Sequence, residues 1–293
     1  MNYRQERVEV ADGVELAVDL WDGDSPAFVL VHGLASNARL WEGVGDRLAA
    51  RGHAVAALDQ RGHGRSDKPD SGYDLPTACA DLEAAVAGLA ARHAAFADCP
   101  VLVGQSWGAN VVLELAWGRP ETARGVVCVD GGMGDMADRF PDWEECARVL
   151  APPRLAGRPA ATMEAVVQRM YAGWPDFAVR AALANFEFRQ DGTIAPWLTY
   201  DRHMQLLKAI WQHRPSTRFP GMKVPVLLVP ADDGSEWAAA KRSSVERAAA
   251  AIPHSRVHWF SPAHHDLHAQ YPDRLAEILH AEATSGLLSG DRR

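Results

Sequence analysis

The sequence predicts an α/β fold: a mostly parallel sheet with helices on both faces. Short, continuous apolar runs, typical of strands buried on both sides, alternate along the chain with Ala- and Leu-rich stretches of helical length. This alternation favours parallel strands joined by helices. The 293 residues, 47% hydrophobic and 23% charged, suit a globular protein with one large domain or a domain carrying an insertion.

The strand and helix signals follow in order along the chain. Two stretches, 7–10 and 14–21, are separated by Ala-Asp-Gly at 11–13, and Asp-Gly between such runs predicts a hairpin. Six further apolar runs predict buried strands at 27–31, 54–58, 101–103, 126–129, 224–229 and 257–260. Helical stretches between or after them lie at about 40–51, 76–95, 110–117, 237–251 and 272–283.

Residues 131–219 interrupt this alternation. The interval has no buried-strand signal, but it has helical stretches, many prolines and numerous aromatic residues. We therefore predict a helical subdomain inserted between two strands of the sheet. The chain then divides into a core, residues 1–130 and 220–293, and an insertion, residues 131–219.

Charge and hydropathy exclude several classes of protein. Thirty Lys and Arg residues stand against 38 Asp and Glu residues, a net charge of −8, whereas nucleic-acid binding needs a clustered basic excess. The N-terminal MNYRQERVEV is charged where a secretory signal needs an apolar stretch, and no segment approaches the length of an apolar membrane span. We expect a cytoplasmic protein without nucleic-acid or membrane partners. Its four cysteines form no Cys-x-x-Cys pair and are expected to be reduced.

The strongest local signal is the segment 101–109, Val-Leu-Val-Gly-Gln-Ser-Trp-Gly-Ala. A predicted strand ends here in Gly104-x-Ser106-x-Gly108 and leads directly into a helix. Such a tight turn exposes the serine hydroxyl in a strained backbone geometry, and the helix N-terminus points at it. We interpret Ser106 as a nucleophile.

Two earlier segments strengthen this interpretation. The residues Phe-Val-Leu-Val-His-Gly-Leu-Ala at 28–35, and Leu-Asp-Gln-Arg-Gly-His-Gly-Arg-Ser-Asp-Lys-Pro at 58–69, precede the serine turn. Together the three segments resemble the α/β-hydrolase family over almost the whole chain. The first is similar to that family's strand and oxyanion loop, and the second to its Asp-x-Arg-Gly-x-Gly-x-Ser-x-x-Pro segment. The resemblance implies an α/β-hydrolase fold with a mostly parallel eight-stranded sheet, and a helical cap formed by residues 131–219.

A serine hydroxyl needs a base, and histidine is the usual partner. The family keeps its catalytic histidine after the last strand, in a Gly-x-His-x(6)-Pro pattern that the segment 261–272 matches except for the glycine. Counting back seven residues from Pro272 selects His265 over its neighbour His264. His264 and His268, four residues apart, have no third ligand suggested nearby, so no metal is expected.

Two carboxylates compete to orient this histidine. The family usually places the acid nine residues beyond a proline like Pro225, but that position is Gly234, and Asp233 falls one residue short. Asp130 follows the preceding predicted strand, where some family members, among them haloalkane dehalogenases, place the acid. Either satisfies the need for a buried carboxylate beside the imidazole. We favour Asp130, because two glycines follow it and allow a sharp turn, and keep Asp233 as the alternative.

The resemblance also assigns an oxyanion hole and a pocket. Its donors are the backbone N–H groups of Leu34 and Trp107, which would stabilise a negative oxygen in the transition state, and their side chains are expected to border the substrate. Among the aromatic residues of the insertion, Trp143 and Trp174 are further candidates for substrate binding. Such side chains suggest a largely apolar substrate.

Serine at position 106, where epoxide hydrolases and haloalkane dehalogenases of this fold carry aspartate, argues against alkyl-enzyme chemistry. Our hypothesis is a serine hydrolase that cleaves a small or medium, largely apolar carboxylic ester or lactone through an acyl-enzyme on Ser106. Two alternatives stay open: a C–C bond hydrolase or perhydrolase with the same triad, and a hydrolase-like small-molecule receptor with little turnover. No nucleotide-binding motif is present, so no cofactor is expected. The chain is expected to be a monomer or homodimer.

Overall fold

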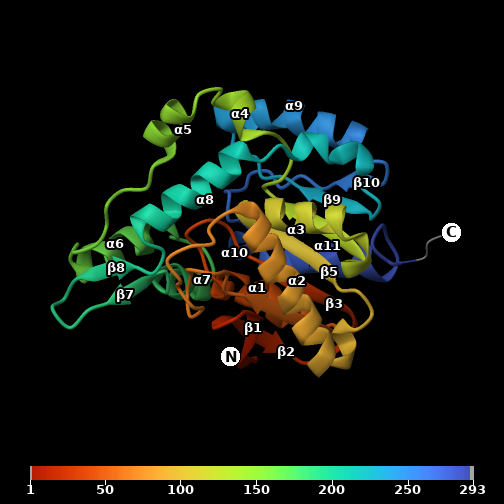
Figure 1. Cartoon of the computed structure of the whole chain (residues 1–293), viewed down its shortest axis with the longest axis horizontal. Coiled ribbons are helices and arrows are strands. Elements are labelled where there is room, and N and C mark those ends of the chain that lie inside the picture. Colours follow the sequence, from red (N-terminus) through yellow and green to blue (C-terminus); the bar gives the residue numbers. More distant parts are fainter. Residues whose placement is uncertain (1, 291–293) are drawn as a thin grey trace.

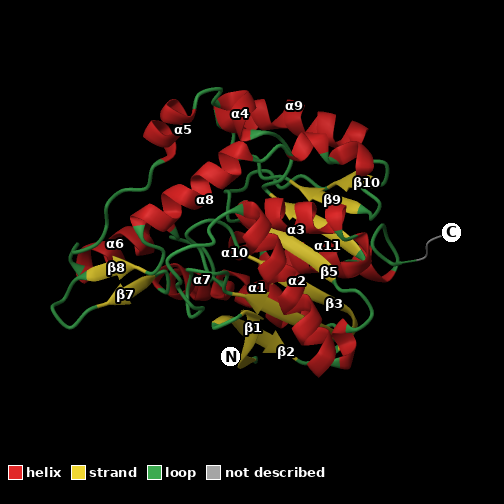
Figure 2. Ribbon diagram, in the orientation of Figure 1, coloured by secondary structure: helices red, strands yellow, loops and turns green. Residues whose placement is uncertain are grey.

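A computed structural model of the chain describes residues 2–290 and contains an eight-stranded sheet with helices on both faces (Figures 1 and 2). The strand order is β1-β2-β4-β3-β5-β6-β9-β10. β1 pairs with β2, and β2 with β4, in antiparallel fashion, while every pair from β4 to β10 is parallel. The predicted fold class is therefore confirmed. The strands are β1 (Arg4–Ala11), β2 (Val14–Trp21), β3 (Asp24–Val31), β4 (His53–Leu58), β5 (Val101–Gln105), β6 (Gly125–Val129), β9 (Val226–Val229) and β10 (Ser255–Val257).

The central strands are apolar throughout because both of their faces are covered. In β3, Val29 and Val31 pack into one buried cluster with helices α2, α3 and α9, whereas Phe28 and Leu30 pack into a second cluster with α1 and α11. This period of two, buried on each side, produces the continuous apolar runs of the sequence. The helices are α1 (Glu42–Ala49), α2 (Leu75–Arg92), α3 (Trp107–Gly118), α9 (Glu236–Ala251) and α11 (Pro272–Thr284).

Two short elements at the core differ from the predicted ranges. The stretch 40–51 divides into a 3-10 turn, η1 (Ala38–Trp41), and α1, with Asn37 capping the turn through its side chain. After the last strand, a four-residue helix, α10 (Leu267–Gln270), was not predicted. Helices this short carry little periodicity, so they are fixed by packing rather than by pattern.

Residues 131–219 form helices and one small hairpin, gathered on one side of the main sheet at the left and top of Figure 1. The hairpin pairs β7 (Phe186–Phe188) with β8 (Ile194–Pro196), so the prediction of an interval without strands was wrong at this point. Its strands have only three residues each and do not join the main sheet, which hides them from a search for long buried runs. The turn Asp191-Gly192 was a signal that could have found them. The helices are α4 (Met136–Arg139), α5 (Trp143–Leu150), α6 (Ala160–Met170), α7 (Asp176–Leu183) and α8 (Tyr200–Gln212).

The inserted segment packs on the core beside the loop that follows β3, which is the predicted oxyanion loop. Ala178 and Ala181 of α7 share a buried cluster with Leu40 of η1 and Ala269 of α10. Asn37, 1% exposed, donates its amide to Ala181 O at 2.7 Å and to Asn185 Oδ1 at 2.6 Å. The helix α7 is thus held against loops that follow two strands of the sheet.

Candidate active site

Ser106 occupies the sharp turn between β5 and α3. Its backbone has φ 53° and ψ −116°, a left-handed conformation that is rare for a residue other than glycine. The glycines on either side permit the turn: a Cβ on Gly104 would lie 2.2 Å from Gly108 O, and a Cβ on Gly108 would lie 2.3 Å from Val31 O. The Gly-x-Ser-x-Gly pattern therefore has a steric reason, which is the close approach of β5, α3 and the end of β3.

His265 and Asp130 lie in contact although they come from distant parts of the chain. Asp130 follows β6 with φ 44°, and His265 lies in the loop between β10 and α10. The distance from His265 Nδ1 to Asp130 Oδ2 is 2.7 Å. The side chain of Asp130 is 3% exposed and that of His265 is 56% exposed, so one edge of the imidazole faces a buried carboxylate while the rest of the ring is open.

The second oxygen of Asp130 also has partners. Asp130 Oδ1 accepts a hydrogen bond from Ala231 N at 2.8 Å and one from Lys241 Nζ of α9 at 2.6 Å. The lysine ammonium donates as well to Ala231 O at 2.8 Å. The carboxylate is thus held on one side by the loop after β9 and by a cation, which leaves its other oxygen directed at His265.

The pKa values of this pair move in opposite directions. Burial alone would raise the pKa of Asp130, but the hydrogen bond and charge of His265, followed by Lys241, lower it below its usual value. Desolvation alone would lower the pKa of His265, but the hydrogen bond and charge of Asp130 outweigh it and raise that pKa. Asp130 is therefore ionised across the neutral range, and its negative charge stabilises the protonated form of His265.

Asp233 lies apart from His265. It is exposed, and its carboxylate accepts hydrogen bonds from the backbone N–H and the hydroxyl of Ser235, which caps the start of α9. His264 is exposed too; its ring lies 5.7 Å from that of Trp174. Of the two carboxylates and two histidines weighed from the sequence, the structure brings Asp130 and His265 together.

The predicted oxyanion loop lies against Ser106. A Cβ on Gly33 would lie 2.9 Å from Ser106 Cβ, so the backbone that leads to Leu34 N passes beside the serine. His32, fully buried, donates through Nδ1 to Gly33 O at 2.7 Å and accepts from Gln60 N through Nε2 at 3.0 Å. Burial lowers the pKa of His32, so it stays neutral and braces the loop. The second expected donor, Trp107 N, begins the helix that follows Ser106.

A further set of hydrogen bonds ties the histidine loop to the serine turn. Gln105, which precedes Ser106, donates through Nε2 to His265 O and to Asp266 Oδ1, both at 3.3 Å. Tyr171 of the inserted segment donates its hydroxyl to Asp266 Oδ2 at 3.1 Å. Sequence patterns did not predict a role for Gln105, Tyr171 or Lys241. Gln105 lies inside the Gly-x-Ser-x-Gly motif, so its position was a signal that could have found it. No local sequence pattern distinguishes Tyr171 or Lys241.

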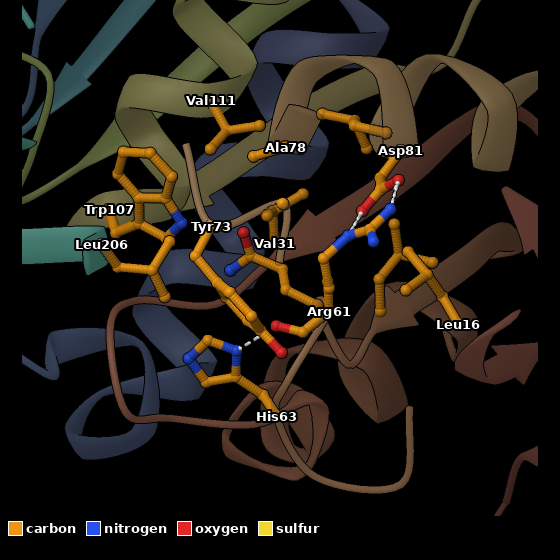
Figure 3. A pocket seen from close by; sticks show the side chains of 14 residues that line it. Leu16, Val31, Arg61, His63, Tyr73, Ala78, Asp81, Trp107, Val111 and Leu206 are labelled. Atoms are coloured by element: carbon orange, nitrogen blue, oxygen red, sulfur yellow. Dashed lines mark hydrogen bonds and ion pairs between the residues drawn. The ribbon is translucent and has the colours of Figure 1, made fainter. Parts of the chain in front are cut away.

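The four side chains expected at the pocket have different surroundings. Leu34 is partly buried against the core. Trp107 is 1% exposed and lines a small cavity of about 20 Å³ with Leu206 and Val111 (Figure 3), so its indole packs between α3 and α8. Trp143 pairs with Trp211, joining α5 to α8.

Trp174 lies nearer to the histidine loop. Its ring centroid is 4.8 Å from that of Tyr171, the residue hydrogen-bonded to Asp266. On another side, its ring lies near the ring of His264. Trp174 therefore belongs to the contact between the inserted segment and the loop that carries His265.

A larger cavity, about 440 Å³, lies between the core and the inserted segment. Ala35 and Ser36, directly after Leu34, line it from the core together with Lys68, and Trp197 and Tyr200 line it from the insertion. Its lining combines apolar and aromatic side chains with polar and charged ones, among them Lys68, Arg154, Glu187, Arg189 and Arg202.

The part of the chain that the structure describes contains neither a membrane-spanning helix nor a cluster of metal-ligand side chains. Among residues 2–290, no helix combines the length and apolar character needed to cross a bilayer. Over the same residues, no three His, Cys, Asp or Glu side chains gather as metal ligands would. His268 is fully buried against Trp41, while His264 is exposed.

The eight-stranded sheet and the strand-to-helix turn at Ser106 are features of the α/β-hydrolase class. The model of the alpha/beta hydrolase family matches residues 28–278. The chain belongs to this family.

Individual curated relatives align with only part of the chain. The chain is 37% identical to 2-(acetamidomethylene)succinate hydrolase of Mesorhizobium japonicum over 108 aligned residues. The aligned stretch covers 37% of this chain and 36% of that protein. Epoxide hydrolase B of Mycobacterium tuberculosis is 33% identical over 108 residues, 36% of this chain and 29% of its own length. The alignments thus span about a third of these curated relatives. The crystal structure of E-2-(acetamidomethylene)succinate hydrolase superimposes with a TM-score of 0.75 at 24% identity, covering 97% of this chain and 99% of its own.

Proposed function

We propose that this protein is a serine hydrolase that cleaves a small or medium, largely apolar carboxylic ester or lactone through an acyl-enzyme on Ser106. The observation that carries the proposal is the 2.7 Å contact between His265 and the buried Asp130, on a loop that Gln105 ties to the serine turn. Asp130 occupies Nδ1 of the imidazole, which leaves Nε2 to take a proton from a hydroxyl.

The proposed reaction has two halves. His265 Nε2 removes the Ser106 proton while the serine oxygen attacks the carbonyl carbon, and the imidazolium then protonates the departing alcohol. Water, deprotonated by His265, attacks the acyl-serine next and releases the carboxylic acid. Backbone N–H groups of Leu34 and Trp107 stabilise the oxyanion in both halves, where each donor is worth about 3 to 4 kcal/mol of barrier.

In this proposal, residues 131–219 act as a cap. The support is the packing of α7 on η1 and α10, and the cavity of about 440 Å³ that the segment lines together with Ala35 and Ser36. Ser106 and His265 are not among the residues that line this cavity. Trp197 and Tyr200 would then contact the substrate, while Trp143 and Trp174 pack within the cap or against the histidine loop. All residues of the proposed site lie on one chain, so the site would be complete in a monomer or in each subunit of a homodimer.

One observation favours a second type of bond that the protein would cleave in its substrate. The relative with 37% identity acts, by its name, on an acetamido compound, and the acyl-enzyme chemistry of a serine hydrolase serves an amide as well as an ester. An acylated amine is therefore the alternative substrate class. Ser106 in place of an aspartate argues against the epoxide chemistry named for the other relative.

The test compares purified wild-type protein with Ser106→Ala on aryl esters of increasing acyl length, on lactones and on N-acyl amines. We expect turnover of at least one class by the wild type and a loss of at least about a thousandfold in the variant. A stoichiometric burst of alcohol, with one acyl group found on Ser106 by mass spectrometry, is also expected. Equal activity of the two proteins would reject Ser106 as the nucleophile.

A further inference from the structure

The carboxylate of Asp130 is shared between a base and a cation. Oδ2 contacts His265 Nδ1 at 2.7 Å, and Oδ1 contacts Lys241 Nζ at 2.6 Å. The lysine belongs to α9, on an element separate from both the serine turn and the histidine loop. Its side chain is 27% exposed and that of Asp130 is 3% exposed, so the ion pair is largely shielded from solvent.

Two hydrogen bonds hold the ammonium in place. Besides Asp130 Oδ1, it donates to Ala231 O at 2.8 Å, while Ala231 N donates to the same carboxylate oxygen. Lys241, Ala231 and Asp130 thus form a closed arrangement on the side of the carboxylate opposite His265. Rotation of the carboxylate away from the imidazole would break two of these bonds.

We propose that Lys241 is a positioning residue that fixes Asp130 toward His265 and sets the pH at which His265 becomes a base. The inference rests on the hydrolase function proposed above and deepens it. An ammonium next to a carboxylate reduces the attraction that the carboxylate exerts on a neighbouring imidazolium. His265 is thereby neutral, and able to accept the serine proton, at a lower pH than Asp130 alone would allow.

The other charged groups around the pair differ in effect. Asp266, next to His265, favours the imidazolium, as Asp130 does, whereas Lys241 opposes it. Arg242, the next residue of α9, pairs with Asp232, and Asp233 bonds to Ser235. Among the described residues, Lys241 is the cation whose ammonium contacts Asp130.

The experiment measures kcat/KM against pH for wild type, Lys241→Gln and Lys241→Met. Removing the cation lets Asp130 hold the imidazolium more firmly, so the rising limb of the profile should move to higher pH, by about half to one pH unit. Lys241→Gln keeps a donor to Oδ1 and should retain most of the plateau rate. Lys241→Met removes both donor and charge, and should lower the plateau as well.

Arg242→Gln is the matched control, because it removes a neighbouring positive charge of the same helix without touching Asp130. Its profile should match the wild type, and Lys241→Arg should also keep the wild-type midpoint. A shift in Arg242→Gln equal to that in Lys241→Gln would reject the specific role, as would a midpoint that is unchanged or lower in both neutral variants.

A second readout does not depend on catalysis. NMR titration of the His265 ring, assigned with His265→Gln, should give a higher pKa in Lys241→Gln than in wild type. If Ser106→Ala remains fully active but this titration shifts, the hydrolase proposal fails while the Lys241–Asp130–His265 linkage stands. If Ser106→Ala is inactive and the titration does not shift, the linkage is wrong and the hydrolase proposal survives.

Discussion

At the residue scale, the site concentrates unusual backbone conformations at two strand ends. Ser106 and Asp130 both have positive φ, at 53° and 44°, and each directly follows a parallel strand. Such conformations cost on the order of 1–3 kcal/mol each and persist where the surroundings hold them. Here a Cβ on Gly131 would lie 2.3 Å from Ser106 O, so the two turns pack directly against each other and present both side chains at one edge of the sheet.

Asp→Asn substitutions distinguish the two carboxylates that the sequence offers as the triad acid. Asp130→Asn keeps the size of the side chain but removes the charge that stabilises the imidazolium, and we expect kcat/KM to fall by about three to four orders of magnitude. Asp233→Asn is the control, and its effect should stay within about threefold, because Asp233 is exposed and bonds to Ser235. A large loss in Asp233→Asn with a mild loss in Asp130→Asn would reverse the proposed assignment of the acid.

The raised pKa of His265 also predicts a pH dependence. Only the neutral imidazole accepts the serine proton, so activity should be low at acid pH and rise through a midpoint above 6.5, the usual value for histidine. A rate profile of kcat/KM between pH 5 and 9 measures this midpoint. In any active Asp130→Asn protein the midpoint should move to lower pH, because the charge that favours the imidazolium is gone; a midpoint below 6 in the wild type would contradict the expectation.

At the element scale, α3 is anchored at its far side as well as at Ser106. Asn110 donates to Ser106 O at 3.2 Å and pairs with His213 at 2.9 Å, and His213 in turn contacts Glu114 at 3.1 Å. Arg218 contacts the same carboxylate at 2.9 Å. The chain that leaves α8 is therefore tied to the helix that carries the candidate nucleophile at its first turn.

Glu114→Gln tests this anchor through stability. Burial opposes the ionised form, but His213 and Arg218 lower the pKa of Glu114 to about 2. The stability that Glu114 contributes is then fully present above its usual value of 4.5 and is lost as pH falls toward 2. We expect Glu114→Gln to lower the free energy of unfolding by roughly 1–3 kcal/mol at pH 7, and by less at pH 3, in urea melts.

Glu83→Gln provides the comparison for that variant. Glu83 pairs with Arg119 on the surface, with side chains 42% and 59% exposed, and exposed pairs contribute about 0–1 kcal/mol. Its melt should therefore stay close to that of the wild type. Equal effects of the two substitutions would mean that the anchor around Glu114 contributes no more than a surface pair.

At the scale of the whole molecule, the inserted segment and the core together line two cavities and share several polar contacts. Asn37 is the most buried of these contacts, and its side chain also accepts from Arg39 N at 3.0 Å to cap η1. Arg202 of α8 donates to Lys68 O at 2.8 Å. The shape of the space between the insertion and the core therefore depends on how the insertion lies on the loops after β3 and β4.

Asn37→Ser removes the hydrogen bonds from Asn37 to the inserted segment and keeps its cap on η1. A serine still accepts from Arg39 N, but it is too short to donate to Ala181 O and Asn185 Oδ1, which lie on the far side. We expect hydrogen exchange of the α7 amides to accelerate by about tenfold or more, while β5 keeps its protection. Unchanged exchange in α7 would show that packing in the cluster around Leu40 holds the helix without these hydrogen bonds.

The class of fold and the position of the serine turn came from the sequence alone, because apolar periodicity and glycines around a strand-to-helix turn are local features. The choice of His265 came from the resemblance of residues 261–272 to the family's histidine pattern. Local signals are weak for three-residue strands, so the hairpin of residues 186–196 was missed. Only the tertiary structure decided which carboxylate meets His265 and which cation meets that carboxylate. Those contacts join positions 135 and 111 residues apart, and no local pattern encodes them, since they depend on how β6, α9 and the loop after β10 come together at one edge of the sheet.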